Sequence, residues 1–302
     1  MGSQIIVRSK QFAYYWLVPE GIRKLLRRLL IRARILPNAT LIAKAAELAK
    51  RNLEFRDRHL GQRCFILATG PSVNSQDLRG LSGELCIAAH FFFLHPQIKV
   101  IKPRYHVITP NHPPFDFDIY DRFLGGIANN YGEDTITFYG YSPFEFSILN
   151  YLKAHPAACR RPYRILDFTQ SPPLDEQNYA EKAIWDIAGS PFTPRTVIYS
   201  AVQLAVYMGC KEIFLIGCDH DYLQDLRRRE NHFYSEATGN PNDAQHLDAF
   251  TMERWFQEYY CRWRDYRLMK THLTSRGVRI LNATAGGMLD VFPRVELSGI
   301  LK

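Results

Sequence analysis

The chain has 302 residues, of which 46% are hydrophobic, 23% charged and 13% aromatic, a globular composition with too much apolar material for a disordered protein. Its net charge of +8 is confined to the first 50 residues, which hold ten basic and two acidic residues. The other 252 residues are neutral, with 28 of each sign. This balance argues against a nucleic-acid-binding catalytic domain, because no basic excess is left to match phosphates.

The basic N-terminal region predicts an amphipathic helix over residues 21–36, with leucines and isoleucines on one side and arginines and lysines on the other. Tyr14, Tyr15 and Trp16, just upstream, are aromatic types that settle at a bilayer interface. Residues 14–36 therefore favour an in-plane anchor on an anionic membrane surface. The alternatives are a helix that packs on the domain with a solvated basic face, or a contact between subunits of a homo-oligomer.

Cysteine usage and targeting signals indicate the compartment. Six cysteines occur without a CxxC pair and several stand in apolar runs, which predicts buried free thiols in a reducing compartment and neither a disulfide framework nor a zinc site. The N-terminus lacks the apolar region of a signal peptide, and no apolar run approaches the roughly 20 residues that span a bilayer. We therefore expect a cytoplasmic protein, peripheral on the inner face of the cell membrane.

From residue 63 onward, short apolar runs alternate with helical stretches. The predicted strands are residues 64–68, 85–89, 105–108, 135–139, 164–168, 212–216 and 278–282, and the clearest predicted helices are residues 196–208 and 247–275. This alternation predicts an α/β, Rossmann-like fold, a mostly parallel sheet with helices on both faces. We divide the chain into a basic N-terminal segment, residues 1–58, and an α/β domain, residues 59–302.

Three polar segments follow apolar runs, where ligands bind in such sheets. The first, ATGPSV at residues 68–73, combines a glycine with a serine that can cap a helix N-terminus. It is neither the dinucleotide fingerprint nor a Walker loop. The second is CDHDY at residues 218–222, and the third is NATAGG at residues 282–287. Together they predict a ligand site at the carboxyl edge of the sheet.

The order of these segments resembles a domain-of-unknown-function family that includes flagellar glycosylation accessory factors and archaeal 6-hydroxymethylpterin diphosphokinases. It is also similar, more distantly, to the sialyltransferases of glycosyltransferase family 42, which implies a GT-A-like variant of the fold. The resemblance covers residues 60–297 and is strongest in TVIYSAVQLAVYMGCKEIFLIGCDHDY and ILNATAGGMLDVFPRV. It does not cover the basic N-terminal helix.

The resemblance implies a set of site residues. The expected substrate-binding residues are Thr69, Gly70, Pro71, Ser72, His90, Thr109, Asn111, Asp219, Tyr222, Tyr234, Asn282 and Thr284. His246 stands where the sialyltransferases have their general base, and His232 is the competing candidate. Two positions depart from the sialyltransferase pattern, because His90 replaces an asparagine and residues 195–197 read Arg-Thr-Val where a Thr-Ser-Gly turn is expected.

The preferred hypothesis is a glycosyltransferase that moves a sialic acid, another nonulosonate or Kdo from its CMP donor to a cell-surface glycan or glycolipid, with a histidine base and no metal or other cofactor. Helix N-terminal amides, tyrosine hydroxyls and an imidazole suffice for this chemistry. The first alternative is an ATP-dependent 6-hydroxymethylpterin diphosphokinase, in which Asp219 and Asp221 would hold Mg²⁺. The second is a non-catalytic, membrane-attached nucleotide-binding scaffold.

Overall fold

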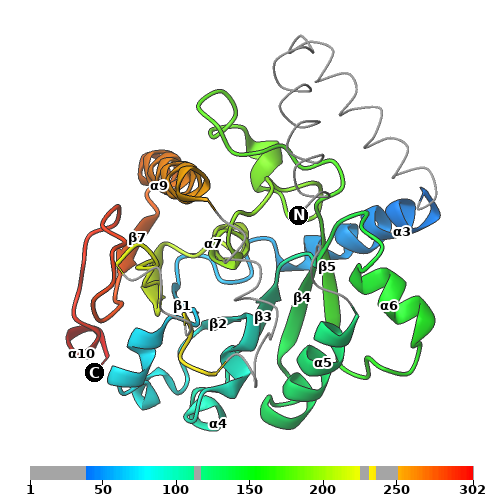
Figure 1. Cartoon of the computed structure of the whole chain (residues 1–302), viewed down its shortest axis with the longest axis horizontal. Helices are drawn as coiled ribbons and strands as arrows, with labels where there is room; N and C mark the ends of the chain where they lie inside the picture. Colours follow the sequence, from blue (N-terminus) through cyan, green and yellow to red (C-terminus); the bar gives the residue numbers. More distant parts are fainter. Residues whose placement is uncertain (1–38, 112–116, 225–230, 236–250, 302) are drawn as a thin grey trace, which may run out of the picture.

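Seven strands form one parallel sheet in the computed structural model of the chain, which describes residues 39–111, 117–224, 231–235 and 251–301 (Figure 1). The strand order is β5-β4-β3-β2-β1-β6-β7. The strands are β1 (Arg63–Leu67), β2 (Cys86–Ala89), β3 (Tyr105–Ile108), β4 (Ile136–Tyr141), β5 (Tyr163–Asp167), β6 (Glu212–Ile216) and β7 (Arg279–Asn282). The predicted fold class is confirmed, and each predicted strand is present with its ends shifted by at most two residues.

Helices surround this sheet. The α-helices are α3 (Ala39–Lys50), α4 (Ile98–Ile101), α5 (Asp118–Asn130), α6 (Ile148–Ala154), α7 (Val197–Tyr207), α9 (Met252–Ser275) and α10 (Leu297–Ile300). Short 3-10 helices are η2 (Arg51–Phe55), η3 (Pro71–Ser75), η4 (Arg79–Leu81), η5 (His90–Leu94) and η6 (Lys182–Trp185). The two clearest predicted helices correspond to α7 and α9, whereas α3, α5 and α6 were not predicted. The predicted basic helix at 21–36 and the aromatic residues 14–16 lie outside the described residues.

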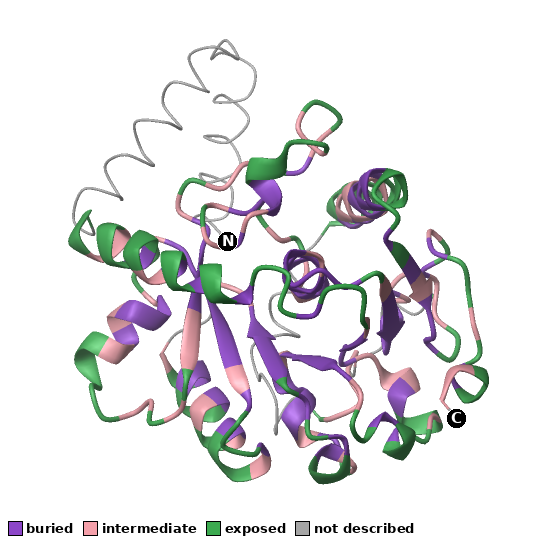
Figure 2. Cartoon of the chain, turned by 180° about the vertical axis from the view of Figure 1, so that it is seen from behind, coloured by how far each residue is buried: buried purple, intermediate pink, exposed green. Residues whose placement is uncertain are grey.

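The sheet is covered on both faces, because alternate residues of each strand enter different apolar clusters. In β1, Cys64 and Ile66 belong to one cluster and Phe65 and Leu67 to the other. Helices α7 and α9 cover the first face, and α4, α5 and α6 cover the second (Figure 1). Figure 2 shows the strands as almost wholly buried, with exposed residues on the outer sides of α3 and α5. This is the burial expected of a doubly covered parallel sheet.

Helix α7 lies at the centre of the first face. Nine of its eleven residues are buried, as expected for a helix that is apolar all round. It packs across β1, β2 and β3. Because β6 follows α7 after a short turn, the helix runs antiparallel to the strands, and its N-terminus therefore lies at the carboxyl edge of the sheet, where the site is expected.

Residues 39–58 pack directly against the sheet. Ala45 of α3 is buried in one apolar cluster and Phe55 of η2 in the other. The buried Asn52 Nδ2 donates hydrogen bonds to the carbonyls of Ile165 and Ile187, at 2.7 and 2.8 Å. Residues 39–58 therefore contribute to the packing of the sheet, although they belong to the predicted N-terminal segment.

All six cysteines are free and four are buried, as predicted, but Cys159 and Cys261 are only half-buried. Among the described helices, none combines the length and the apolar content needed to cross a bilayer.

Candidate functional site

A pocket of about 870 Å³ opens at the carboxyl edge of the sheet. The chain runs outward from β1 to β5 and then returns to place β6 on the other side of β1, so the strand order reverses between β1 and β6. Ligands of open α/β sheets bind at such switch points. The pocket is lined by residues that follow β1 to β6, by Asn231, His232 and Tyr234, by the N-terminus of α7 and by one side of α9.

The turn after β1 is fixed by close packing against the turn after β6. The N–H of Gly70 donates to the carbonyl of Gly217 at 2.9 Å. A Cβ atom on Gly70 would lie 1.8 Å from Oδ2 of Asp219, so only glycine fits there. The Asp219 carboxylate accepts hydrogen bonds from the Ser72 N–H at 3.2 Å and the Ser72 hydroxyl at 2.8 Å. Asp219 therefore connects the turn after β1 to the turn after β6 at the topological switch point.

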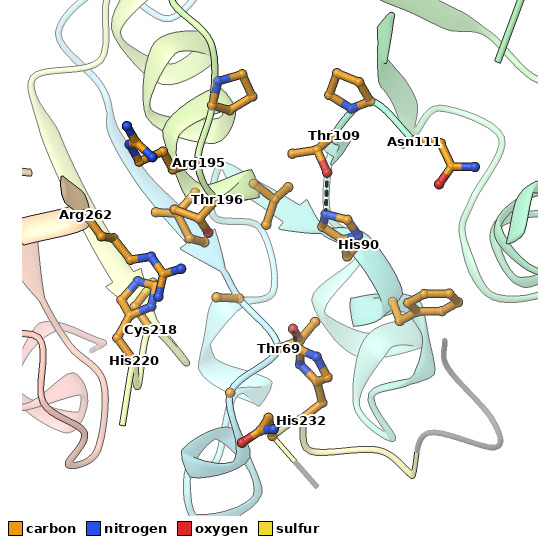
Figure 3. Close-up of a pocket in the computed structure, with 18 of the residues that line it drawn as sticks. Thr69, His90, Thr109, Asn111, Arg195, Thr196, Cys218, His220, His232 and Arg262 are labelled. Carbon is orange, nitrogen blue, oxygen red and sulfur yellow. Dashed lines mark hydrogen bonds between the residues drawn. The ribbon is translucent and has the colours of Figure 1, made fainter. Parts of the chain in front are cut away.

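His232 lies directly against the first turn. Its Nδ1 is 3.0 Å from the hydroxyl oxygen of Thr69, and the N–H of Phe233 donates to the Thr69 carbonyl at 3.0 Å. The imidazole stacks on the ring of Tyr234, with centroids 5.0 Å apart and planes 9° apart. Figure 3 shows Thr69 and His232 side by side in the pocket. These contacts hold an imidazole beside the glycine turn.

A second wall comes from the residues after β2 and β3. His90 has a positive φ of 47°, and its Nε2 is 3.0 Å from the Thr109 hydroxyl oxygen (Figure 3). Beneath it, Nε2 of His106 donates to the His90 carbonyl at 2.6 Å. Complete burial lowers the pKa of His106 to about 3, so this imidazole is neutral at pH 7. His106 thus stabilises the strained backbone that directs His90 into the pocket.

The opposite wall carries arginines, and Figure 3 shows Arg195, Thr196 and Arg262 across the pocket from His90, Thr109 and Asn111. Nε of Arg195 donates to Oδ2 of Asp265 at 3.0 Å. Burial raises the pKa of Asp265, while Arg264 and Arg195 act in the opposite direction. Arg262 extends from α9 toward the pocket, over the rings of Tyr222 and Tyr259 at 6.0 and 5.6 Å.

His220 is a buried histidine in the turn after β6. Its φ is 48°, and its Nε2 is 2.8 Å from the hydroxyl oxygen of Tyr266. The hydroxyl of Tyr259 donates to the His220 carbonyl at 2.9 Å. Burial, reinforced by the nearby Arg262, lowers the pKa of His220 to about 3. His220 is therefore neutral at pH 7 and is held by tyrosines on α9.

The structure brings most of the predicted site residues together. Those that line the pocket are Thr69, Gly70, His90, Thr109, Asn111, Asp219, Tyr222, His232 and Tyr234. Pro71 and Ser72 are not among the lining residues and belong to the turn behind Gly70. The other histidine candidate, His246, lies outside the described residues.

Asn282 and Thr284 do not line the pocket. The side-chain amide of Asn282 donates to the Leu289 carbonyl at 2.8 Å, and the Thr284 hydroxyl oxygen accepts the N–H of Cys218 at 3.0 Å. Both side chains are buried. They support the turn after β6 from behind, so their contribution to the site is indirect.

Several lining residues were missed by the sequence analysis. Ser142 follows β4 and Thr169 follows β5, positions that the carboxyl-edge rule identifies without any motif. Arg195 lies in the segment 195–197 and His220 in the CDHDY segment, but neither was predicted to be a site residue. Arg262 gave no signal, because it is one of several arginines on a mixed aromatic and charged helix.

Among the described residues, no three His, Cys, Asp or Glu side chains gather as metal ligands would. Asp219 and Asp221 both line the pocket, and the carboxylate of Asp219 accepts hydrogen bonds from Ser72. What the described part of the site offers is a set of hydroxyls, amides, imidazoles and arginines around a glycine turn.

No protein-family model and no curated protein matches the chain, so the sequence resemblance has no support of that kind. Among solved structures the chain is similar to the sialyltransferase CstII from Campylobacter jejuni. The CstII complex with cytidine-5'-monophosphate is 12% identical over 78% of this chain and 85% of that chain, with a TM-score of 0.44. The CstII complex with CMP-3FNeuAc is 12% identical over 78% of this chain and 86% of that chain, with a TM-score of 0.45. The complex of CST-II with a trisaccharide acceptor and CMP is 14% identical over 77% of this chain and 85% of that chain, with a TM-score of 0.45.

Proposed function

We propose that the chain is a glycosyltransferase that moves an acidic sugar from a CMP donor to a glycan or glycolipid acceptor. The observation that carries this proposal is the contact between His232 and Thr69, which holds an imidazole beside the glycine turn at the topological switch point. A nucleotide on that turn would present its reactive sugar carbon close to a proton acceptor. The pocket, at about 870 Å³, is within the range of small-molecule and cofactor sites.

The nucleotide has suitable partners in the pocket. Thr69, Thr109 and Asn111 offer neutral hydrogen-bonding groups, which suit a cytosine and a ribose. Phe91 and Phe123 line the pocket beside them and stack on each other with centroids 4.5 Å apart. Aromatic walls with a few placed polar groups are typical of sites for planar ligands.

The proposed reaction breaks the bond between the anomeric carbon and the phosphate oxygen of the donor. The bonding electrons stay with the phosphate and give CMP, and the acceptor hydroxyl oxygen forms the new bond to carbon. Its proton passes to a neutral imidazole acting as general base. His232 is favoured as this base by its position in the pocket, and His246 remains the candidate from the sequence resemblance.

The test is a screen of CMP-activated sugars for donor hydrolysis and transfer, with chelator present. We expect His232→Ala to lower kcat by about 100-fold or more, the usual contribution of a general base, while CMP affinity changes little. His246→Ala is assayed in parallel. His155→Ala is the matched control, because His155 is exposed and lies outside the pocket.

The outcomes separate the hypotheses. Full activity in His232→Ala with loss in His246→Ala identifies His246 as the base. Thermal stabilisation by ATP only with Mg²⁺, and none by CMP, would replace the proposal with the diphosphokinase. No response to either nucleotide would favour the non-catalytic scaffold.

A further inference from the structure

Arg262 is a charged side chain in which two guanidinium nitrogens lack hydrogen-bond partners within the described residues. Its Nε and Nη1 atoms are buried, and neither has a hydrogen-bond partner within the described residues. The residue lines the pocket and extends from α9 toward it (Figure 3). Leaving a buried guanidinium nitrogen unpaired is costly, and such atoms in a native structure call for an explanation.

The neighbouring arginines on this wall of the pocket are paired with carboxylates. Arg264 donates to Oδ1 of Asp265 through Nε and Nη2, at 3.0 and 2.7 Å. Arg195 donates to the other oxygen of Asp265 and also approaches Glu258 at 3.5 Å. Both carboxylates of this cluster are therefore occupied by arginines other than Arg262. Within the described residues, Arg262 is the arginine of this cluster that makes no contact with a carboxylate, so its guanidinium is available to a group from outside the protein.

The N-terminus of α7 adds a second positive feature to the same wall. Thr196 precedes the first helical residue, and its side chain makes no capping hydrogen bond. Thr196, Val197 and Ile198 all line the pocket. The first-turn N–H groups of a helix lack partners within the helix and favour anions. The N-terminus of α7 and Arg262 therefore lie on the same side of the pocket (Figure 3).

We propose that Arg262 binds the anionic group of the ligand, a phosphate or a carboxylate, at the wall formed by α7 and α9. This inference deepens the proposed function and rests on it for the nature of the ligand, since a CMP-linked acidic sugar carries both groups. The Tyr222 and Tyr259 rings hold the guanidinium in place before the ligand arrives. Arg262 is thus a specificity-determining residue for the charged end of the substrate.

The experiment compares Arg262→Met, Arg262→Lys and wild type in the full chain. Affinities are measured for CMP, cytidine and free N-acetylneuraminate, and melting temperatures are recorded with inorganic phosphate against chloride at equal ionic strength. Arg267→Met is the matched control, because Arg267 lies on the same helix, outside the pocket, and its ion pair within the described residues is with the exposed Glu176.

We expect Arg262→Met to bind CMP or the acidic sugar at least about tenfold more weakly, the size expected for losing a hydrogen bond between charged groups. Cytidine affinity should be unchanged, and the melting temperature without ligand unchanged or higher, because an unpaired buried charge has been removed. A loss confined to CMP assigns the phosphate to Arg262, and a loss confined to the sugar assigns the carboxylate. Arg262→Lys should recover only part of the affinity, since an ammonium cannot bind both oxygens of the anion.

Two results would overturn the proposal. One is an equal loss for cytidine and CMP together with a lower melting temperature, which indicates a structural role. The other is unchanged affinity for every anion in Arg262→Met. A wild-type chain that responds to phosphate but not to CMP or the sugar would refute the proposed function; loss of that phosphate response in Arg262→Met would still support the anion site.

Discussion

The smallest feature on which the site depends is the missing side chain of Gly70. The φ of −62° at Gly70 is accessible to any residue, so glycine is required here because there is no room for a Cβ atom. Oδ2 of Asp219 and the carbonyl of Gly217 occupy the volume that a Cβ atom would need. The same carboxylate holds Ser72. A single methyl group at this position would therefore disturb both turns of the switch point.

Gly70→Ala should reduce the free energy of unfolding by about 1 to 3 kcal/mol, the usual cost of overpacking, and should also weaken CMP binding. Urea denaturation and a nucleotide titration measure the two effects. Gly125→Ala is the control, because a Cβ there meets nothing within 4 Å and the position is inside α5, where alanine is favoured. Wild-type stability and affinity in Gly70→Ala would contradict the close packing described here.

At the scale of elements, a buried side-chain amide adds hydrogen bonds to the apolar packing that holds α3 and η2 on the sheet. The exposed fraction of Asn52 is 0%, and its Nδ2 donates to a carbonyl in β5 and to another after η6. Buried carbonyls without a partner are costly. Asn52 therefore connects three segments that are far apart in the sequence.

Asn52→Ala should destabilise the chain by about 2 to 4 kcal/mol, because two buried carbonyls lose their donor. Chemical denaturation monitored by circular dichroism measures this change. Leu53→Ala serves as the comparison, since Leu53 is the next residue and is 54% exposed, so its truncation should cost less than about 0.5 kcal/mol. Equal effects of the two substitutions would show that Asn52 does not anchor the segment.

For the whole molecule, the buried histidines link stability to pH. Burial lowers the pKa of His106 and of His220 from 6.5 to about 3. Between these values the unfolded chain binds protons that the folded chain does not, so stability falls as the pH is lowered through this range. The stabilisation is complete above pH 6.5 and is lost progressively toward pH 3.

Each of these histidines should remove about 2 kcal/mol of stability between pH 7 and pH 5. Urea midpoints at the two pH values measure the loss. The glutamine in His106→Gln does not titrate and keeps an N–H donor. The free energy of unfolding of this variant should therefore fall by about 2 kcal/mol less than that of the wild type between pH 7 and pH 5. An identical pH dependence in the two proteins would mean that His106 is protonated in the folded state.

Much of the fold was predictable because its signals are local. Buried parallel strands are short apolar runs, and all seven were located from such runs. The helix α7 is apolar on every side and was equally clear. Helix α5 was not predicted, and α3 was assigned to the N-terminal segment. Helix α3 does carry apolar residues at helical spacing, which the sequence analysis did not use, but its position against β5 depends on contacts that local sequence does not display.

The sequence by itself determined the strands and the edge of the sheet at which polar loops gather, because hydrophobic periodicity and chain direction settle both. Only the tertiary structure decided which side chains meet there. Arg254, Arg262, Arg264 and Arg267 are alike in the local pattern of α9. Asp265 contacts Arg264 of α9 and Arg195 of the turn before α7, so Arg262 has no carboxylate partner among the described residues. Such pairing depends on packing between distant segments, and no local pattern encodes it.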